Sequence, residues 1–495
     1  MRRRAATVKI GSSPLCPVTR GQKSKTRCRL SERRTFKNPM RDVREVVRTG
    51  IGSASWSALS TLGRGTSLSA ARIARPFGSL APPELGRAGL ADSRSWIEAE
   101  RTRIPASVFR MPAEIALPRL LRIGGGAFAD TPKVLADLGL KRPLIVTDSF
   151  LSKLGLADRL AGLLKHADGV RIFSGAVPDP TSGSVDIGLA YLQEQDHDCV
   201  IGLGGGSSID TAKAIAVLAV HGGPVRKFKA PFQQSEPGLP IIAIPTTAGT
   251  GSEATRFTIV TDDDSGEKML CIGPAYLPTA AIVDYELTLE KPKRLTADTG
   301  VDSLTHAIEA YVSRRANPFA DTFCRGAMEA IWKSLPVAYF EPKNRAARES
   351  MMLAATQAGI AFSNSSVALV HGMSRPIGAR FHVPHGLSNA MLLPPITTFS
   401  LPGNLHRYAD CARVMHIAKS DVNDETAAAT LVEALKQLNR QLEVPTPEKL
   451  GIDRKQWFDA IPTMVEQAIA SGSPANNPRV PSPEEMGELY REVYG

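Results

Sequence analysis

The sequence has no long apolar segment and few cysteines. Its apolar runs fall short of the roughly 18 uninterrupted residues that a membrane span needs, and Met1-Arg2-Arg3-Arg4 does not lead into the apolar core of a secretory signal. The 6 cysteines are scattered and form no CxxC pair. This pattern indicates neither a disulfide framework nor a thiolate zinc site. We therefore expect a cytoplasmic protein with reduced thiols and no membrane partner.

The basic charge is confined to one end of the chain. The net charge is +11, but residues 1–110 carry 23 Lys and Arg against 7 Asp and Glu, while the others carry 37 against 42. This extension is rich in Arg, Ser, Gly and Pro and lacks a regular period, which predicts low order. It could be an organellar transit peptide, a nucleic-acid-binding tail, or upstream sequence translated from a wrongly chosen start. We favour the last, because Met111 precedes the first regular pattern.

Residues 111–293 alternate between strand and helix signals. Apolar runs at residues 143–147 and 239–244 predict buried strands, and residues 151–164 predict an amphipathic helix. This alternation is typical of a parallel sheet covered by helices. Residues 294–495 lose the strand signals and predict a second, helical domain.

Two glycine-rich loops follow predicted strands. Gly204-Gly205-Gly206-Ser207 lies where a strand gives way to a helix, so its backbone amides could bind a phosphate. It is not the usual GxGxxG series, and a plain strand-to-helix turn is the alternative. Thr246-Thr247-Ala248-Gly249-Thr250 forms a second such loop. Because ligands of open α/β sheets bind at this edge, the two loops together predict a nucleotide cofactor site.

Asp148 ends the first strong strand. A carboxylate there could accept hydrogen bonds from ribose hydroxyls and would repel a 2′-phosphate, which favours NAD over NADP. Asp148 precedes the glycine turn, whereas the acidic residue of the usual order follows it. A strand-end Asp is also a common turn former.

Asp302, His306, His371 and His385 have the type and spacing of a divalent-metal site. On a helix, a separation of four residues places Asp302 and His306 on one face, one turn apart. His371 and His385 are fourteen residues apart, which suits a helix followed by a loop that returns to the same pocket. Neutral imidazoles with one carboxylate suit Fe(II) or Zn(II). For any one of these histidines alone, an ordinary packed or surface role is the alternative.

Over about residues 112–495, the chain resembles the iron-containing (group III) alcohol dehydrogenase family. The matching motifs are GGGSSID at 204–210, PTTAGT at 245–250, GVDSLTHA at 300–307, HGM at 371–373 and PHG at 384–386. The resemblance implies an N-terminal Rossmann-like α/β domain, an all-α C-terminal domain, and a cleft between them that holds NAD and iron. It implies that Asp302, His306, His371 and His385 ligate the iron. The residues it implies for the cofactor site are Asp148, Asp179, Gly206, Ser207, Asp210, Thr246, Thr247 and Lys268.

One position departs from the family pattern. Many members have a second histidine four residues after the third ligand, where this chain has Arg375. Arginine stays protonated near neutral pH and is a poor general base, so proton transfer would depend on water, the cofactor ribose or His382. We predict that Arg375 binds an anion, either a substrate carboxylate or phosphonate or the cofactor pyrophosphate. A structural salt bridge at the cleft rim is the alternative. Arg375 and His382 are thus the predicted catalytic residues.

The resemblance implies hydride transfer between NAD and a small alcohol or hydroxy acid, or the reverse reduction of an aldehyde, by a homodimer. Alternatives on the same fold are a zinc glycerol dehydrogenase, a dehydroquinate-synthase-like lyase and a hydroxyacid–oxoacid transhydrogenase. An alternative outside the enzymes is a protein that binds nucleic acid through its basic extension. The complete set of four predicted metal ligands disfavours this alternative.

Overall fold

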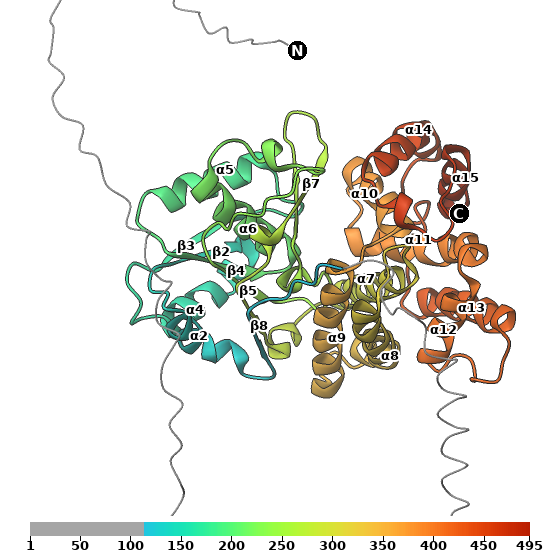
Figure 1. Cartoon of the computed structure of the whole chain (residues 1–495), viewed down its shortest axis with the longest axis horizontal. Helices are drawn as coiled ribbons and strands as arrows, with labels where there is room; N and C mark the ends of the chain where they lie inside the picture. Colours follow the sequence, from blue (N-terminus) through green and yellow to red (C-terminus); the bar gives the residue numbers. More distant parts are fainter. Residues whose placement is uncertain (1–112) are drawn as a thin grey trace, which may run out of the picture. The chain divides into compact units, whose positions relative to one another are not determined.

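The computed structural model describes residues 113–495, which comprise a sheet-centred α/β domain followed by helices (Figure 1). The basic extension predicted at 1–110 lies outside the described residues. Within 113–495, no helix is both long enough and apolar enough to cross a membrane.

Six parallel strands form the central sheet, in the order β1-β8-β5-β4-β2-β3. The strands are β1 (Leu120–Ile123), β2 (Pro143–Asp148), β3 (Arg171–Ala176), β4 (Cys199–Gly204), β5 (Ile241–Pro245) and β8 (Ala280–Val283). β2, β4, β5 and β8 are buried almost throughout, as expected for strands covered on both faces. The predicted α/β class is confirmed.

Helices cover both faces of the sheet. The helices of this domain are α2 (Thr131–Leu138), α3 (Ser149–Lys153), α4 (Leu156–Leu163), α5 (Ser182–Gln193) and α6 (Gly206–His221). Alternate strand residues point to opposite faces: Ile145 packs in one core with Leu160 of α4, whereas Leu144 packs in another with Ile215 of α6.

Two features of this domain differ from the sequence predictions. The single helix predicted over 151–164 is wrong, because Gly155 adopts a left-handed φ of 75° and separates α3 from α4. An antiparallel hairpin of β6 (Phe257–Thr261) and β7 (Lys268–Ile272) was not predicted. The hairpin strands alternate between buried and partly exposed residues, which is typical of a ribbon covered on one face.

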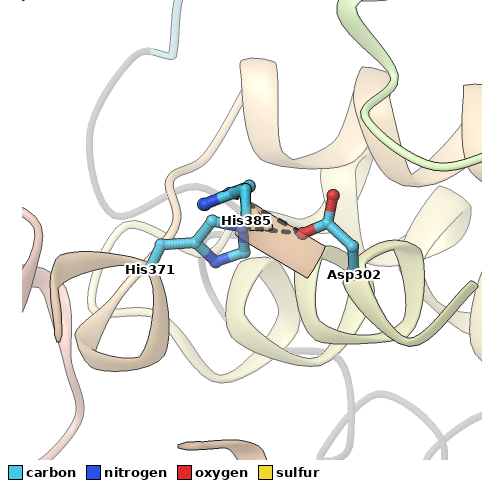
Figure 2. Close-up of side chains that lie close together, drawn as sticks. All are labelled: Asp302, His371 and His385. Atoms are coloured by element: carbon cyan, nitrogen blue, oxygen red, sulfur yellow. Dashed lines mark ion pairs between the residues drawn. The ribbon is translucent and has the colours of Figure 1, made fainter. Parts of the chain in front are cut away.

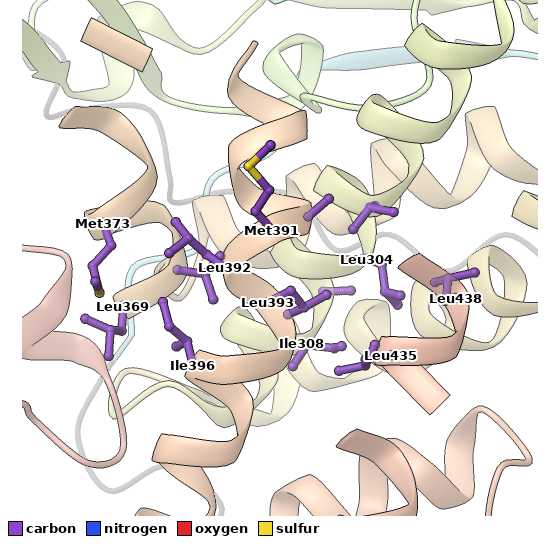
Figure 3. Close-up of a cluster of buried hydrophobic side chains, with 14 of the residues drawn as sticks. Leu304, Ile308, Leu369, Met373, Met391, Leu392, Leu393, Ile396, Leu435 and Leu438 are labelled. Carbon is purple, nitrogen blue, oxygen red and sulfur yellow. The ribbon is translucent and has the colours of Figure 1, made fainter. Parts of the chain in front are cut away.

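Helices make up the rest of the described chain. They are α7 (Lys293–Val312), α8 (Pro318–Phe340), α9 (Arg345–Ser363), α10 (Leu369–Phe381), α11 (His385–Ser400), α12 (Leu405–Val414), α13 (Asp424–Gln441), α14 (Arg454–Ala470) and α15 (Pro483–Tyr494). Figure 3 shows their shared apolar core, in which Leu304 and Ile308 of α7 join Leu369 of α10, Leu393 of α11 and Leu435 of α13. α7 is buried at every residue from Gly300 to Val312, so polar side chains on it must find partners inside the protein.

The strand order reverses between β2 and β4. The chain leaves β2 toward β3 on one side and leaves β4 toward β5 on the other. Open α/β sheets bind ligands at such a switch point, outside the carboxyl ends of the strands. Asp148 ends β2 and Gly204 ends β4, so this edge carries the residues predicted for the cofactor.

The loop after β5 is held against α9 by two glycines. A Cβ added at Gly359 would lie 2.7 Å from the carbonyl oxygen and 2.8 Å from the Cα of Gly251. We predict that Gly359→Ala lowers the free energy of unfolding by about 1–3 kcal/mol, because backbone must move to make room. Gly326→Ala in α8 is the control, since its Cβ would meet only the Gln357 side chain at 3.5 Å.

Urea denaturation of both variants checks this prediction. We expect the control to gain up to about 1 kcal/mol, as Ala replaces Gly within a helix. Equal stability changes in the two variants would contradict close backbone packing at Gly359.

Candidate metal and cofactor site

Three imidazoles converge on one carboxylate oxygen. Asp302 Oδ1 lies 3.5 Å from His371 Nε2, 3.8 Å from His385 Nε2 and 3.9 Å from His306 Nε2. Asp302 and His306 lie one turn apart on α7, as their spacing predicts. Figure 2 shows the Asp302 carboxylate facing His371 and His385, and the ligand atoms of these three residues lie within 4.8 Å of one another.

The two later histidines come from consecutive helices. His371 lies in the first turn of α10, and His385 is the first residue of α11, after a short connection of three residues. The Ser374 hydroxyl lies 3.2 Å from Nδ1 of His385 and 2.6 Å from the Ser388 hydroxyl, which fixes the imidazole from behind. The connection thus returns the chain to the same pocket, in agreement with the sequence prediction.

The donor set fits a divalent cation. The Asn389 amide nitrogen lies 2.6 Å from Asp302 Oδ1 and 3.2 Å from Nε2 of both His371 and His385. An amide group has two hydrogens, one fewer than the three acceptors present once Nε2 of His371 is deprotonated. The Oδ1 of Asn389 and the Nδ1 of His306 are buried without a hydrogen-bond partner among the described residues. A cation that accepts lone pairs from the carboxylate and imidazoles would satisfy acceptors that the amide cannot.

Glu309 is a site residue that the sequence analysis missed. Its Oε2 lies 2.6 Å from Nδ1 of His371, and its two oxygens also accept the backbone N–H groups of Ala368 and Val370. A carboxylate behind a histidine ligand fixes the tautomer that leaves Nε2 free for a metal. The signal was in the sequence, because Asp302, His306 and Glu309 are spaced i, i+4, i+7 on one helix face.

Burial and charge set the protonation of the cluster. Burial lowers the pKa of His306 to about 3 and that of His385 to about 4, despite the Asp302 carboxylate. Burial alone would also lower the pKa of His371, but the carboxylates of Glu309 and Asp302 raise it to about 8. Two imidazoles are therefore neutral at pH 7, as metal ligation requires, and the third holds a proton that a metal must displace.

Part of the predicted cofactor set lies together at the sheet edge. Gly205 caps the N-terminus of α6, which begins at Gly206. The backbone N–H of Asp179 donates to the Ser207 hydroxyl at 3.3 Å, and the Asp179 carboxylate pairs with Lys268 Nζ at 2.9 Å. Lys268 therefore ties the β6–β7 hairpin to the helix N-terminus predicted to bind phosphate.

Asp148 and Asp210 have structural partners as well. Asp148 Oδ1 caps α3 by accepting the N–H groups of Phe150 and Leu151, and its other oxygen lies 3.4 Å from the Ser208 hydroxyl. Asp210 accepts the Ser252 hydroxyl at 2.6 Å and the Ile259 N–H at 3.0 Å. The second oxygen of Asp148 has only the long contact with Ser208, whereas both oxygens of Asp210 hold the second loop and β6.

The second predicted loop lies beside a lysine that the sequence analysis did not single out. Lys291 Nζ donates to the Thr246 hydroxyl at 3.4 Å, and burial lowers its pKa although Asp148 opposes that shift. Thr247 lines a small cavity with Lys291 and Thr299. Thr246, Thr247 and Asp148 thus share one cationic neighbour.

The two predicted catalytic residues have different environments. His382 is exposed and follows α10 as its C-cap in a left-handed conformation with φ 55°. Its proton-transfer role stays a prediction. Arg375 donates to the Ser473 hydroxyl at 3.2 Å and forms no ion pair with any residue of 113–495, so the salt-bridge alternative is wrong for the described chain.

Comparison with protein families identifies the fold and the enzyme class. Residues 118–285 match the model described as iron-containing alcohol dehydrogenase, and residues 296–494 match the C-terminal model of the Fe-containing alcohol dehydrogenase family. The chain belongs to the iron-containing alcohol dehydrogenase family. It is therefore an oxidoreductase of this family, and the predicted enzyme class is confirmed.

Individual relatives agree with this membership. The chain is 35% identical over 379 residues to the NAD-dependent methanol dehydrogenase of Bacillus methanolicus, covering 76% of this chain and 98% of the relative. It is 37% identical over 363 residues to 1-propanol dehydrogenase PduQ of Citrobacter freundii, covering 73% and 95%. The crystal structure of a 1,3-propanediol oxidoreductase matches with a TM-score of 0.74 at 33% identity, covering 78% of this chain and 100% of that one. The expected fold class is confirmed.

The Glu309–His371 pair makes metal binding depend on pH. Because the pKa of His371 is raised to about 8, we expect metal affinity to fall about tenfold per pH unit below that value. Glu309→Gln removes the carboxylate that raises this pKa, so the fall in metal affinity should begin at a lower pH than in the unmodified protein. Because Glu309 no longer orients the His371 imidazole, metal binding should also weaken by about 10- to 100-fold at high pH.

Titration calorimetry of metal-stripped protein with Zn(II) checks this prediction. Glu329→Gln is the control, since Glu329 is exposed and pairs with His416. An identical pH dependence in Glu309→Gln and the unmodified protein would contradict the role of Glu309.

Proposed function

We propose that this enzyme is a metal-dependent, NAD-linked dehydrogenase of small alcohols, which also reduces the corresponding aldehydes. In the oxidative direction, the alcohol carbon gives a hydride to NAD⁺ and the hydroxyl gives a proton to solvent, so the products are an aldehyde, NADH and H⁺. The observation that carries the proposal is the convergence of three imidazole nitrogens on Asp302 Oδ1.

The ligand residues are proposed to hold Fe(II), and the same set accepts Zn(II). When bound, such a cation acts as a Lewis acid on the alcohol oxygen, and NAD accepts the hydride. Asp302 would supply a carboxylate ligand, and His306, His371 and His385 would supply imidazole nitrogens. Glu309 would hold the His371 tautomer, while Ser374 would orient His385. His306 is held by stacking on Phe362, with ring centroids 4.2 Å apart.

The cofactor is proposed to bind at the switch point of the sheet. The free amides at the start of α6, with Gly205, Gly206 and Ser207, would hold the pyrophosphate. Asp148, which has one oxygen not used in capping, would accept the ribose hydroxyls and repel a 2′-phosphate. The same site would be bordered by Thr246, Thr247, Asp179 and Lys268. Asp210 would hold the loop after β5 in place through its bonds to Ser252 and Ile259.

The relatives' names support small alcohols as substrates. They include dehydrogenases of methanol, 1-propanol and 1,3-propanediol, and a solved structure of a sulfoacetaldehyde reductase in complex with NAD⁺. The predicted homodimer and cytoplasmic location belong to this proposal. Analytical ultracentrifugation and cell fractionation test them.

Metal reconstitution tests the proposed chemistry. We expect metal-stripped protein to regain NADH formation with Fe(II) or Zn(II) on short alcohols. Asp302→Asn should lose at least about 100-fold in activity at equal metal concentration, because a neutral amide is a poorer ligand for Fe(II) or Zn(II) than a carboxylate is. Asp186→Asn is the control, because Asp186 is an exposed residue of α5.

The absorbance of NADH gives the readout. Full activity of Asp302→Asn would overturn the assigned ligand set. Activity of the unmodified enzyme on aldehyde–alcohol pairs without added NAD would instead favour a transhydrogenase that retains its cofactor.

Cofactor choice tests the assignment of Asp148. One relative is named an NADPH-dependent butanol dehydrogenase, so the preference must come from local residues of each chain. We expect Asp148→Ala to raise the ratio of kcat/KM for NADP over NAD by about tenfold or more. The variant loses the carboxylate that would accept the ribose hydroxyls of NAD and repel the 2′-phosphate of NADP. Asp158→Ala is the control, as Asp158 is exposed on α4. An unchanged ratio would remove Asp148 from the ribose site.

A further inference from the structure

A cavity of about 100 Å³ lies between the hairpin and two of the later helices. The hairpin contributes Lys268 and Leu270, α10 contributes Arg375 and Ala379, and α14 contributes Gln467. This volume is below the roughly 300–1,000 Å³ that is typical of sites for drug-sized ligands. The cavity therefore suits a short molecule.

The lining carries one cation, Arg375, that forms no ion pair within residues 113–495. Of the two lysines that line the cavity, Lys229 pairs with Glu267 and Lys268 pairs with Asp179 at 2.9 Å. Arg375 has only the neutral Ser473 hydroxyl at 3.2 Å, and its Nε is buried without a hydrogen-bond partner in the described chain. Arg375 is half-buried, and a guanidinium that loses part of its hydration without gaining an anionic partner carries an energetic cost. An anion in the cavity would relieve that cost.

The unbalanced guanidinium lies next to the proposed metal ligands. Arg375 is one turn after His371 on α10, and its neighbour Ser374 contacts Nδ1 of His385 at 3.2 Å. The positive charges of Lys268 and Arg375 both act to lower the pKa of His385. Arg375 and Lys268 are therefore near enough to His385 for their charges to act on it, although burial is the main cause of its lowered pKa.

One of the proposed cofactor residues, Lys268, lines the same cavity. Lys268 links to Asp179, and the N–H of Asp179 donates to the Ser207 hydroxyl at the start of α6. A Cβ added at Gly378, one turn after Arg375, would lie 3.3 Å from Lys268 Nζ. Through Lys268 and Arg375, the cavity thus adjoins residues that neighbour the proposed cofactor edge and the ligand-bearing helix α10.

We propose that Arg375 binds the acidic group of the substrate and makes the enzyme selective for short hydroxy acids and their aldehyde acids. The inference rests on the proposed function. A guanidinium can donate two parallel N–H bonds to a carboxylate, and phosphonate offers the same acceptor chemistry. The pyrophosphate of the cofactor is disfavoured as the partner, because the α6 N-terminus already provides a site for it. Arg375 is thus a specificity-determining residue.

Kinetics with matched substrates test this proposal. The iron-reconstituted full chain is assayed with 3-hydroxypropanoate against 1-propanol and with 4-hydroxybutanoate against 1-butanol. We expect Arg375→Ala to lower the ratio of kcat/KM for acid over alcohol by about 10- to 100-fold, as removal of a charged hydrogen-bond donor does. The ratio for Arg375→Lys should lie between those of the unmodified enzyme and Arg375→Ala. Lysine keeps the positive charge but lacks the two parallel N–H donors of the guanidinium. Arg380→Ala is the control, since Arg380 is exposed on the same helix.

A binding measurement separates this inference from the proposed function. Calorimetric titration with propanoate or butanoate reports the anion site without turnover, and we expect Arg375→Ala to weaken binding by at least about tenfold. Arg375→Gln serves the same purpose if Arg375→Ala does not fold. A lack of turnover in the unmodified enzyme, with carboxylate binding that depends on Arg375, would overturn the dehydrogenase and leave the anion site standing.

Two results would overturn the inference itself. An unchanged acid-to-alcohol ratio in an active Arg375→Ala enzyme would show that the guanidinium does not contact the substrate. A rise of tenfold or more in KM for NAD, at an unchanged ratio, would assign the guanidinium to the cofactor pyrophosphate.

Discussion

The buried carboxylate of Asp302 is the constraint on which the site depends. This residue is 2% exposed, and removing an ionised carboxylate from water is costly unless opposite charge or donors replace the water. One of its oxygens faces three imidazoles and the Asn389 amide. At pH 7 the protonated His371 and the Asn389 amide face that charge, and a divalent cation bound by Asp302 and the imidazoles would replace the His371 proton. The arrangement therefore fits a candidate metal site.

The same helix connects the metal site to the cofactor edge. α7 presents Asp302, His306 and Glu309 to the cluster, and the hydroxyl of Ser303 donates to the carbonyl of Gly249 at 2.8 Å. Gly249 belongs to the loop after β5 and packs against Thr299, where an added Cβ would be 2.5 Å away. Because α7 is buried along most of its length, it cannot shift without disturbing both groups of residues. Precise relative placement of donor and acceptor atoms, which hydride transfer requires, follows from this shared helix.

Local patterns in the sequence were enough for much of the fold and for the residues that gather around Asp302 Oδ1. The apolar runs of β2 and β5, the glycine turn at Gly204 and the i, i+4 pair on α7 all depend on neighbours in sequence. Features that depend on distant partners were missed. The ion pair between Lys268 and Asp179 joins the hairpin to the loop after β3. The hydrogen bond from Asn389 to Asp302 joins α11 to α7. The break at Gly155 was missed because a left-handed glycine leaves the apolar period of the helix unchanged.

The most direct test is an anomalous-difference map at the iron absorption edge, from crystals of the full chain grown with Fe(II). We predict one dominant peak in contact with Asp302 Oδ1 and with the Nε2 atoms of His306, His371 and His385. A peak at any other group of residues, or no peak at these four in iron-loaded crystals, would contradict the metal site on which the proposed chemistry depends.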